Sequence, residues 1–243
     1  LPLPGRLLSL SGYVLPEDRP KVAEAMLIYE RLGQPIPSVM PEPLAAHVRV
    51  ASQTRTGGAK ATRIPELSAV KTNERPSDQR RRPNPPRFWY MLPNLARRHV
   101  PDAFVARINQ RSPVAVTNRA EPVVVDANFS TAWSDSSRWT PSAITALLCS
   151  SWVRACMESI GTPMGGGALK LEATHLKRLP VPKFTDHEIG QLASLGGGDL
   201  IATVDPIVTK AVLGGGPGMH SISQMNERLL DFIEKAEQAR QRG

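Results

Sequence analysis

The stretch GTPMGGGALKL at residues 161–171, followed by LKRLPVP at residues 176–182, is the part of the chain from which we predict the fold. Its three consecutive glycines at 165–167 allow a sharp turn or a close backbone approach. The residues Ala168–Leu171 that follow, which are apolar apart from Lys170, are typical of a short strand. Ala173–Arg178 predicts a helical turn, and the prolines after it end the segment. A glycine turn, a strand and a helical turn are therefore expected in this order.

The residues before this stretch predict a long helix preceded by short strands. Thr140 followed by Pro141 is typical of a helix start, and Gly161 is typical of a helix end. The helix between them is largely apolar, with a hydrophobic face formed by Ile144, Leu147, Leu148, Trp152, Ala155 and Met157. Turn residues separate three Val-rich segments that predict strands, at Ala103–Ile108, Pro113–Thr117 and Val123–Val125.

Residues 184–243 predict a helical C-terminal region. Helix-start signals occur three times, in Thr185 with Glu188, Asp205 with Pro206, and Ser221 with Gln224. Together with the strands, these signals predict an α+β fold. We expect an irregular, mostly antiparallel β core with a long helix packed on it, followed by this helical region.

The N-terminal third of the chain has a weaker pattern. Asp18 predicts the cap of a helix over residues 20–32. A Pro-rich linker at 35–45 follows, and Leu44–Ser52 is interpreted as a strand. Residues 53–87 are polar and basic with little apolar periodicity, so we expect a long loop.

Positive charge is concentrated in one region of the chain. The formal net charge is +8 and the pI is about 9.9. Between His47 and Arg119 there are 15 Lys and Arg against 4 Asp and Glu, which leaves 15 against 18 elsewhere. Such a region is typical of proteins that bind nucleic acid, although a solvated basic surface or a basic arm would give the same count.

Several other classes of protein are disfavoured. Cys149 and Cys156 lie in one predicted helix at a spacing of about 10 Å along its axis, which is too far for a disulfide. We interpret them as small core residues in a reducing compartment and expect a cytoplasmic protein. The spacing of Cys and His predicts no metal site. No apolar run approaches the ~18 residues of a membrane span.

The tetrapeptide Asn84-Pro85-Pro86-Arg87 shares its first three positions with the catalytic motif of amino-group DNA methyltransferases. The fourth position of that motif is an aromatic residue that stacks on the flipped base. Here Arg87 occupies this position and Phe88 comes one residue late, and no Phe-x-Gly-x-Gly turn for the methyl donor precedes the motif. We therefore interpret these residues as a proline-rich loop entry and expect no catalytic residue in this chain.

Two other motifs combine groups that suit nucleic acid. Arg87-Phe88-Trp89-Tyr90 places aromatic rings, which can stack, beside arginine, which can contact phosphates or guanine edges. Burial of Phe88 and Tyr90 in the core is an equally compatible interpretation. The glycine triplet, with Lys170, Lys177 and Arg178 after it, could approach phosphates closely, although a flexible loop explains a glycine triplet equally well.

The two segments quoted first, Gly161–Leu171 and Leu176–Pro182, resemble the end of target-recognition domains in gamma-type adenine-specific DNA methyltransferases and restriction–modification enzymes. A related pattern ends the recognition domains of type I restriction specificity subunits. The resemblance covers roughly residues 86–183, where Arg87–Tyr90 is similar to an early aromatic strand and Val123–Phe129 to a later one. It implies an N-terminal helical segment and linker at 1–45, a DNA-binding recognition domain at 46–183 and a helical region at 184–243.

The resemblance implies sequence-specific recognition of double-stranded DNA for a methyltransferase. S-adenosylmethionine would then bind a catalytic domain or subunit other than this chain, and no membrane is involved. A half-size type I specificity subunit, a diverged enzyme and an unrelated basic RNA-binding protein remain alternatives. We expect a phosphate-contacting loop at Gly165, Gly166 and Gly167, and DNA contacts from Lys60, Arg63, Arg87, Trp89, Arg111, Asn118, Arg119, Lys170, Lys177 and Arg178.

Overall fold

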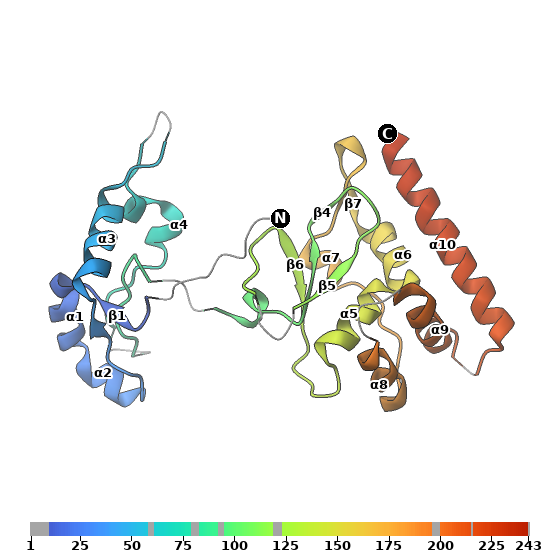
Figure 1. Ribbon diagram of the computed structural model, residues 1–243, viewed down its shortest axis with the longest axis horizontal. Coiled ribbons are helices and arrows are strands. Elements are labelled where there is room, and N and C mark those ends of the chain that lie inside the picture. Colours follow the sequence, from blue (N-terminus) through green and yellow to red (C-terminus); the bar gives the residue numbers. More distant parts are fainter. Residues whose placement is uncertain are drawn as a thin grey trace. The chain divides into compact units, whose positions relative to one another are not determined.

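The computed structural model divides the chain into two compact units, Leu1–Asn94 and Leu95–Gly243, each of which is described by itself (Figure 1). These two units differ from the three segments expected from the sequence. The units are defined by contacts, so they do not test the functional boundaries of the expected segments. Among the residues described, no helix is long and apolar enough to cross a membrane. The described residues are 10–57, 61–78, 83–91, 95–118, 123–195, 200–214 and 216–242.

The smaller unit is mostly helical, with short elements around an apolar cluster. Its two strands, β1 and β2, pair in parallel. The buried cluster includes Val22, Ile28 and Tyr29 from the helices, together with Phe88 and Tyr90. The elements are β1 (Tyr13–Val14), η1 (Pro16–Asp18), α1 (Arg19–Glu24), α2 (Met26–Arg31), β2 (Ser38–Val39), α3 (Glu42–Gln53), η2 (Ile64–Glu66) and α4 (Ser68–Lys71).

Two predictions for the smaller unit are wrong. The single helix expected over 20–32 is broken at Ala25, a fully buried residue whose N–H bonds the Val22 carbonyl at 3.0 Å in a tighter turn. The strand expected at Leu44–Ser52 is helix α3. Its buried residues Ala45 and Val48 lie three positions apart, so their spacing follows the period of a helix.

The larger unit contains a three-stranded antiparallel sheet with the order β5-β3-β6. Its strands are β3 (Ala103–Ala106), β5 (Ala115–Thr117) and β6 (Phe129–Ala132). Ala103, Val105 and Ala115 are buried and belong to the same core cluster as the helices that cover one face of the sheet. The strand expected at Val123–Val125 is not formed, because the N–H and the carbonyl of Val123 bond the Asn118 side chain. The third strand of the sheet, β6, begins at Phe129.

The apolar helix expected from Thr140 to Gly161 is two helices, α5 (Pro141–Cys149) and α6 (Ser151–Ile160). Ser150 lies between them in an extended conformation, and its hydroxyl caps α6 by accepting from the Val153 N–H at 3.2 Å. A second hydrogen bond at the break is donated by the Ser151 N–H to the buried Asp205 carboxylate, at 2.7 Å. Burial raises the pKa of Asp205 above its ordinary value. The break is therefore stabilised by a residue 54 positions further along the chain.

The break also separates the two cysteines, which lie on different helices. Cys149 on α5 is buried and Cys156 on α6 is half-buried, and both are free thiols. Burial raises the pKa of both thiols, as expected of cysteines that pack in the protein interior.

The C-terminal region is helical, as predicted: α8 (Asp186–Ser194), α9 (Leu200–Leu213) and α10 (Met219–Arg242). The capping box of Thr185 and Glu188 is confirmed at the start of α8. The other two helix-start predictions are wrong, because Pro206 lies inside α9 and α10 begins at Met219, before Ser221. The small antiparallel sheets and the covering helices confirm the α+β class.

The packing at Gly161 gives a prediction for stability. A Cβ atom there would lie 2.7 Å from Cδ1 of the fully buried Leu169 and 2.9 Å from the Met157 carbonyl oxygen. Gly161→Ala should therefore lower the free energy of unfolding by about 1–3 kcal/mol, measured by urea denaturation. The matched control is Gly190→Ala in α8, where a Cβ would meet no atom within 4 Å. It should raise stability by up to about 1 kcal/mol. Equal stability of the two variants would contradict this packing.

Candidate nucleic-acid interface

A second small sheet, with the order β4-β8-β7, brings the predicted glycine loop and the turn that carries Arg111 together. Its strands are β4 (Ile108–Asn109), β7 (Thr162–Pro163) and β8 (Leu169–Lys170). Asn109 pairs with Leu169 in antiparallel register. The chain after Asn109 and the chain before Leu169 therefore emerge at the same end of the sheet. The Arg111 turn (residues 109–112) and the glycine turn (residues 165–167, η4) share this end.

The glycine turn is shaped by backbone conformations that favour glycine. Gly166 and Gly167 have φ of 76° and 77°, in the left-handed region. Gly165 and Gly166 are exposed, and a Cβ on either would meet open space. Gly167 is buried, and a Cβ there would lie 3.0 Å from the Gln241 Cα of helix α10. The close backbone approach that the sequence suggested is thus made to α10 at Gly167, while the first two glycines are open to solvent.

Arg111 is exposed at the tip of the neighbouring turn. No ion pair holds its guanidinium within the described part of the chain. The next residue, Ser112, is buried, and its N–H donates to Glu237 Oε2 at 2.9 Å. Its hydroxyl accepts from Arg154 Nε at 3.1 Å. Arg111 therefore projects from a turn whose base is fixed.

Lys170 lies beside an acidic residue. Its ammonium group is 2.8 Å from Glu172 Oε1, and Arg107 Nη2 is 2.9 Å from the same oxygen. The hydrogen bond from Lys170, and then its charge, hold the pKa of Glu172 below its ordinary value. Part of the positive charge of Lys170 and Arg107 is thus neutralised within the protein. Arg107 was not among the residues selected from the sequence, and its acidic partner is 65 positions away.

Lys177 and Arg178 follow helix α7 (Ala173–Leu176) and are both exposed. A groove of about 710 Å³ opens beside the start of this helix, lined on its other sides by η3 (Arg97–His99) and β6. Its lining combines the ring of Phe129 with the cations Arg98 and Arg107. Neither of these cations is among the residues that the sequence predicted to contact DNA.

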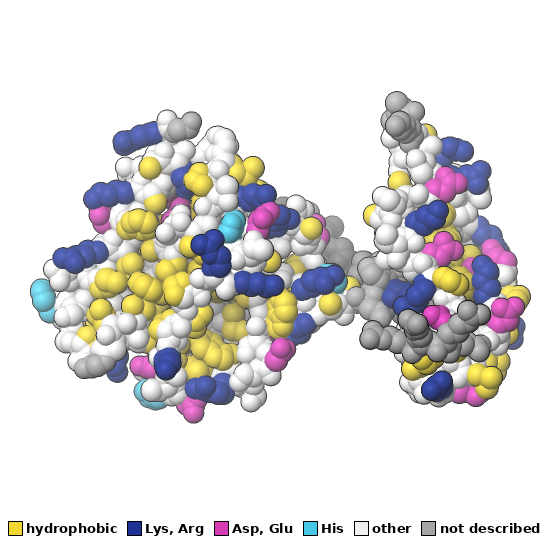
Figure 2. All heavy atoms as spheres, turned by 180° about the vertical axis from the view of Figure 1, so that it is seen from behind, with side chains coloured by type: hydrophobic (Ala, Val, Ile, Leu, Met, Phe, Trp, Pro, Cys, Tyr) yellow, Lys and Arg dark blue, Asp and Glu magenta, His cyan; other side chains and the backbone are white. Residues whose placement is uncertain are grey.

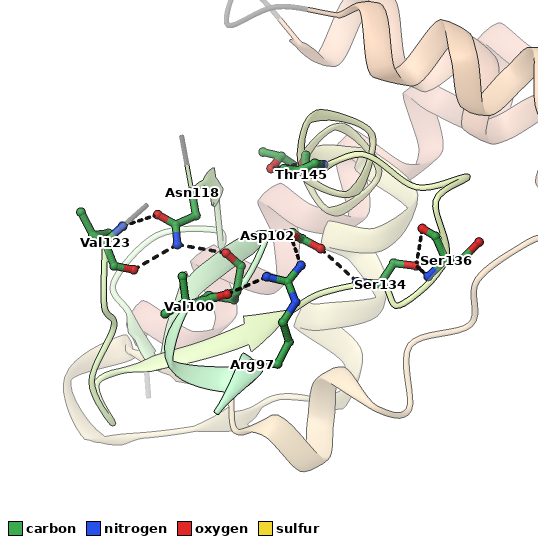
Figure 3. Close-up of polar contacts among 10 residues, drawn as sticks. Arg97, Val100, Asp102, Asn118, Val123, Ser134, Ser136 and Thr145 are labelled. Carbon is green, nitrogen blue, oxygen red and sulfur yellow. Dashed lines mark hydrogen bonds and ion pairs between the residues drawn. The ribbon is translucent and has the colours of Figure 1, made fainter. Parts of the chain in front are cut away.

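The Asn118 side chain is buried, with only 7% exposed, and is surrounded by hydrogen bonds (Figure 3). Its Nδ2 donates to the carbonyl oxygens of Pro101 and Val123, each at 3.0 Å. Its Oδ1 accepts from the Val123 N–H at 2.8 Å. A base edge could bind this amide only after these bonds break, so we do not include Asn118 among the proposed base-reading residues.

The buried carboxylate of Asp102 joins the same region of the sheet to its surroundings (Figure 3). One oxygen accepts from Arg97 and the other from the Ser134 N–H at 3.0 Å. Arg97 also donates to the Val100 carbonyl at 2.8 Å. Arg97 is therefore engaged in fixing the chain before β3.

The remaining predicted residues lie in the smaller unit or outside the described residues. Arg63 is exposed at the start of η2. Arg87 forms an isolated β-bridge with Arg75, and burial, followed by the charge of Arg75, lowers its pKa. Trp89 is half-buried and packs edge-on against Tyr90, with ring centroids 5.6 Å apart. Lys60 and Arg119 lie outside the described residues.

The face of the β5-β3-β6 sheet opposite the helices is apolar. Val116 and Phe129 are exposed on it, and the rings of Phe104 and Phe129 meet edge to face at 5.1 Å. Figure 2 shows a broad hydrophobic area on the visible face of the larger unit, with Lys and Arg side chains around its margin.

The larger unit is thus an α+β domain in which a small sheet presents a basic turn beside a glycine turn. Residues 77–204 match the family of the C-terminal domain of the type II methyltransferase M.Eco57I. The match spans 128 of the 243 residues, and the chain belongs to this family. No curated protein and no solved structure gives a significant match. The domain is therefore associated with a DNA methyltransferase.

The hydrogen bonds of Asn118 predict a role in stability. Asn118→Ala should lower the free energy of unfolding by about 2–3 kcal/mol, because it leaves the Val123 N–H and two carbonyl groups without their partner. The control Asn128→Ala, at an exposed position, should change the free energy of unfolding by less than about 0.5 kcal/mol. Thermal unfolding monitored by circular dichroism measures both. If Asn118→Ala leaves the free energy of unfolding unchanged, the amide of Asn118 is available for another role.

Proposed function

We propose that this chain binds double-stranded DNA in a sequence-specific manner and presents a target adenine to a methyltransferase of a restriction–modification or phage-defence system. Methyl transfer, and the S-adenosylmethionine that it needs, would belong to a catalytic domain or subunit other than this chain. Membership of the M.Eco57I C-terminal family is the observation that carries the proposal. The motif at residues 161–182, which resembles target-recognition domains, supports the finer assignment.

The geometry of the larger unit fits two kinds of DNA contact. Arg111 is an exposed cation that forms no ion pair with the described residues, and the base of its turn is fixed, as required of a side chain that reads a guanine edge. Lys177 and Arg178 are exposed cations of the kind that contact phosphates. Lys170 contributes less free charge, because Glu172 is paired with it. Sequence reading is therefore assigned to the Arg111 turn and non-specific attraction to the cations after α7.

The proposal predicts a strong dependence of DNA affinity on salt. If about 5–8 phosphates are neutralised, the slope of log K against log salt concentration should be roughly −4 to −7. Fluorescence anisotropy with a duplex selected from a random pool measures it, with a scrambled duplex and a single-stranded RNA as comparisons. A slope near zero would mean that the basic region is a solvated surface, and tighter binding to the RNA would favour the RNA-binding alternative.

The two kinds of contact predict different effects of mutation. Arg111→Ala should weaken binding to the selected duplex by about 1–3 kcal/mol and leave the scrambled duplex nearly unaffected. Lys177→Ala or Arg178→Ala should weaken both alike and reduce the salt slope by about one unit each. Arg228→Ala, which removes the same charge from an exposed position on α10, is the control. Parallel losses on both duplexes for Arg111→Ala would show that sequence is read elsewhere.

A further inference from the structure

We propose that the last turns of helix α10 position the Arg111 turn and the glycine turn for DNA recognition, with Glu237 and Arg240 as the positioning residues. This inference rests on the proposed function. Helix α10 lies outside the residues that match the family, which end at 204. The contribution of this helix to recognition therefore has to be argued from its contacts.

Arg240 joins α10 to the glycine turn. Its guanidinium donates to the carbonyl oxygen of Gly167. It also forms a two-pronged ion pair with Glu158 of helix α6, with Nε–Oε2 and Nη2–Oε1 distances of 3.0 Å each. Only 6% of the Arg240 side chain and 0% of the Glu158 side chain are exposed. A buried pair of this geometry fixes its members tightly, because loss of either leaves an uncompensated charge inside the protein.

Glu237 joins the same helix to the Arg111 turn. Its Oε2 accepts the Ser112 N–H at 2.9 Å, directly after the residue that we assign to base reading. Ser112 is held from the other side by Arg154 of α6, at 3.1 Å from its hydroxyl. The base of the Arg111 turn is therefore hydrogen-bonded to both α10 and α6.

The two anchoring residues act as a unit because of their spacing on α10. Glu237 and Arg240 are three positions apart, so they lie on one face of the helix. Steric contact adds to their hydrogen bonds, because Gly167 approaches the Gln241 Cα too closely to leave room for a Cβ. In Figure 1 the C-terminal end of α10 and the loop between β7 and β8 lie at the same end of the larger unit. Any displacement of this end of α10 would therefore move both turns.

A purely structural role for α10 makes different predictions from a positioning role. Loss of a structural contact lowers stability and weakens binding to every DNA alike. Loss of a positioning contact changes the orientation of Arg111, so it reduces discrimination between the selected and the scrambled duplex. That loss should also disappear once Arg111 itself has been removed, because the two residues would act through the same contact.

The test compares Glu237→Ala with Glu234→Ala, a control on the same helix whose exposed carboxylate bonds only Gln238 among the described residues. Glu237→Ala should reduce the affinity ratio between the selected and the scrambled duplex by about 5–20-fold, the lower part of the range expected for loss of one oriented base contact, because Arg111 is displaced and not removed. Glu237→Gln, which keeps an acceptor oxygen, should restore most of the ratio. In an Arg111→Ala background, Glu237→Ala should have no further effect on the ratio.

Hydrogen exchange in the absence of DNA provides an independent measurement. Glu237→Ala should accelerate amide exchange at Ser112, and Arg240→Met should accelerate it around the glycine turn, while Glu234→Ala changes neither. The inference is overturned if Glu237→Ala behaves like Glu234→Ala in both exchange and discrimination, or if its effect persists unchanged without Arg111. If the unmodified protein does not discriminate between duplexes, the proposed function fails, and the exchange data still show whether α10 holds the turns.

Discussion

The larger unit depends on the burial of helix α5, because its strands are too short to form a core of their own. The strands contain two to four residues each, whereas every residue of α5 from Ala143 to Cys149 is buried. This helix packs in one cluster with the inner face of the β5-β3-β6 sheet and with α8 and α9. Short sheets with few backbone bonds need such a covering layer to exclude water from one face. This packing fixes the strands from which the turns emerge.

The sequence predicted those parts of the fold that are encoded by neighbouring residues. The glycine turn, the short strand after it and the capping box of α8 all follow from local patterns, and they were found correctly. The break between α5 and α6 was missed, and one of the groups that stabilise it, Asp205, is distant in sequence. The same aspartate was misread as a helix cap before Pro206, since Asp at the cap followed by Pro at the first helical position is a helix-start signal. Local pattern thus failed where a buried polar residue bonds a distant partner.

The candidate interface was predictable in residue type but not in pairing. An exposed cation on a turn, such as Arg111, can be identified from the polar residues around it. Whether such a cation is already neutralised cannot be identified from its neighbours in sequence. Its acidic partner comes from another element, as Glu172 does for Arg107. The amide of Asn118 shows the same limit, since one of its acceptors is the carbonyl of Pro101, 17 positions away. Sequence patterns select groups able to bind DNA, and tertiary contacts decide which of them remain available.

Six cations of the larger unit illustrate two different physical roles. Arg97, Arg107 and Arg240 form ion pairs with carboxylates, and the pair made by Arg240 is buried, so these charges act mainly in holding the fold. Arg111, Lys177 and Arg178 are exposed. Paired charges contribute little to the long-range field, whereas exposed cations attract a polyanion and can release its counterions on contact. If α10 fixes the turn that carries Arg111, the paired charges set the geometry in which the exposed charges meet DNA. Affinity and selectivity would then arise from different residues of the larger unit.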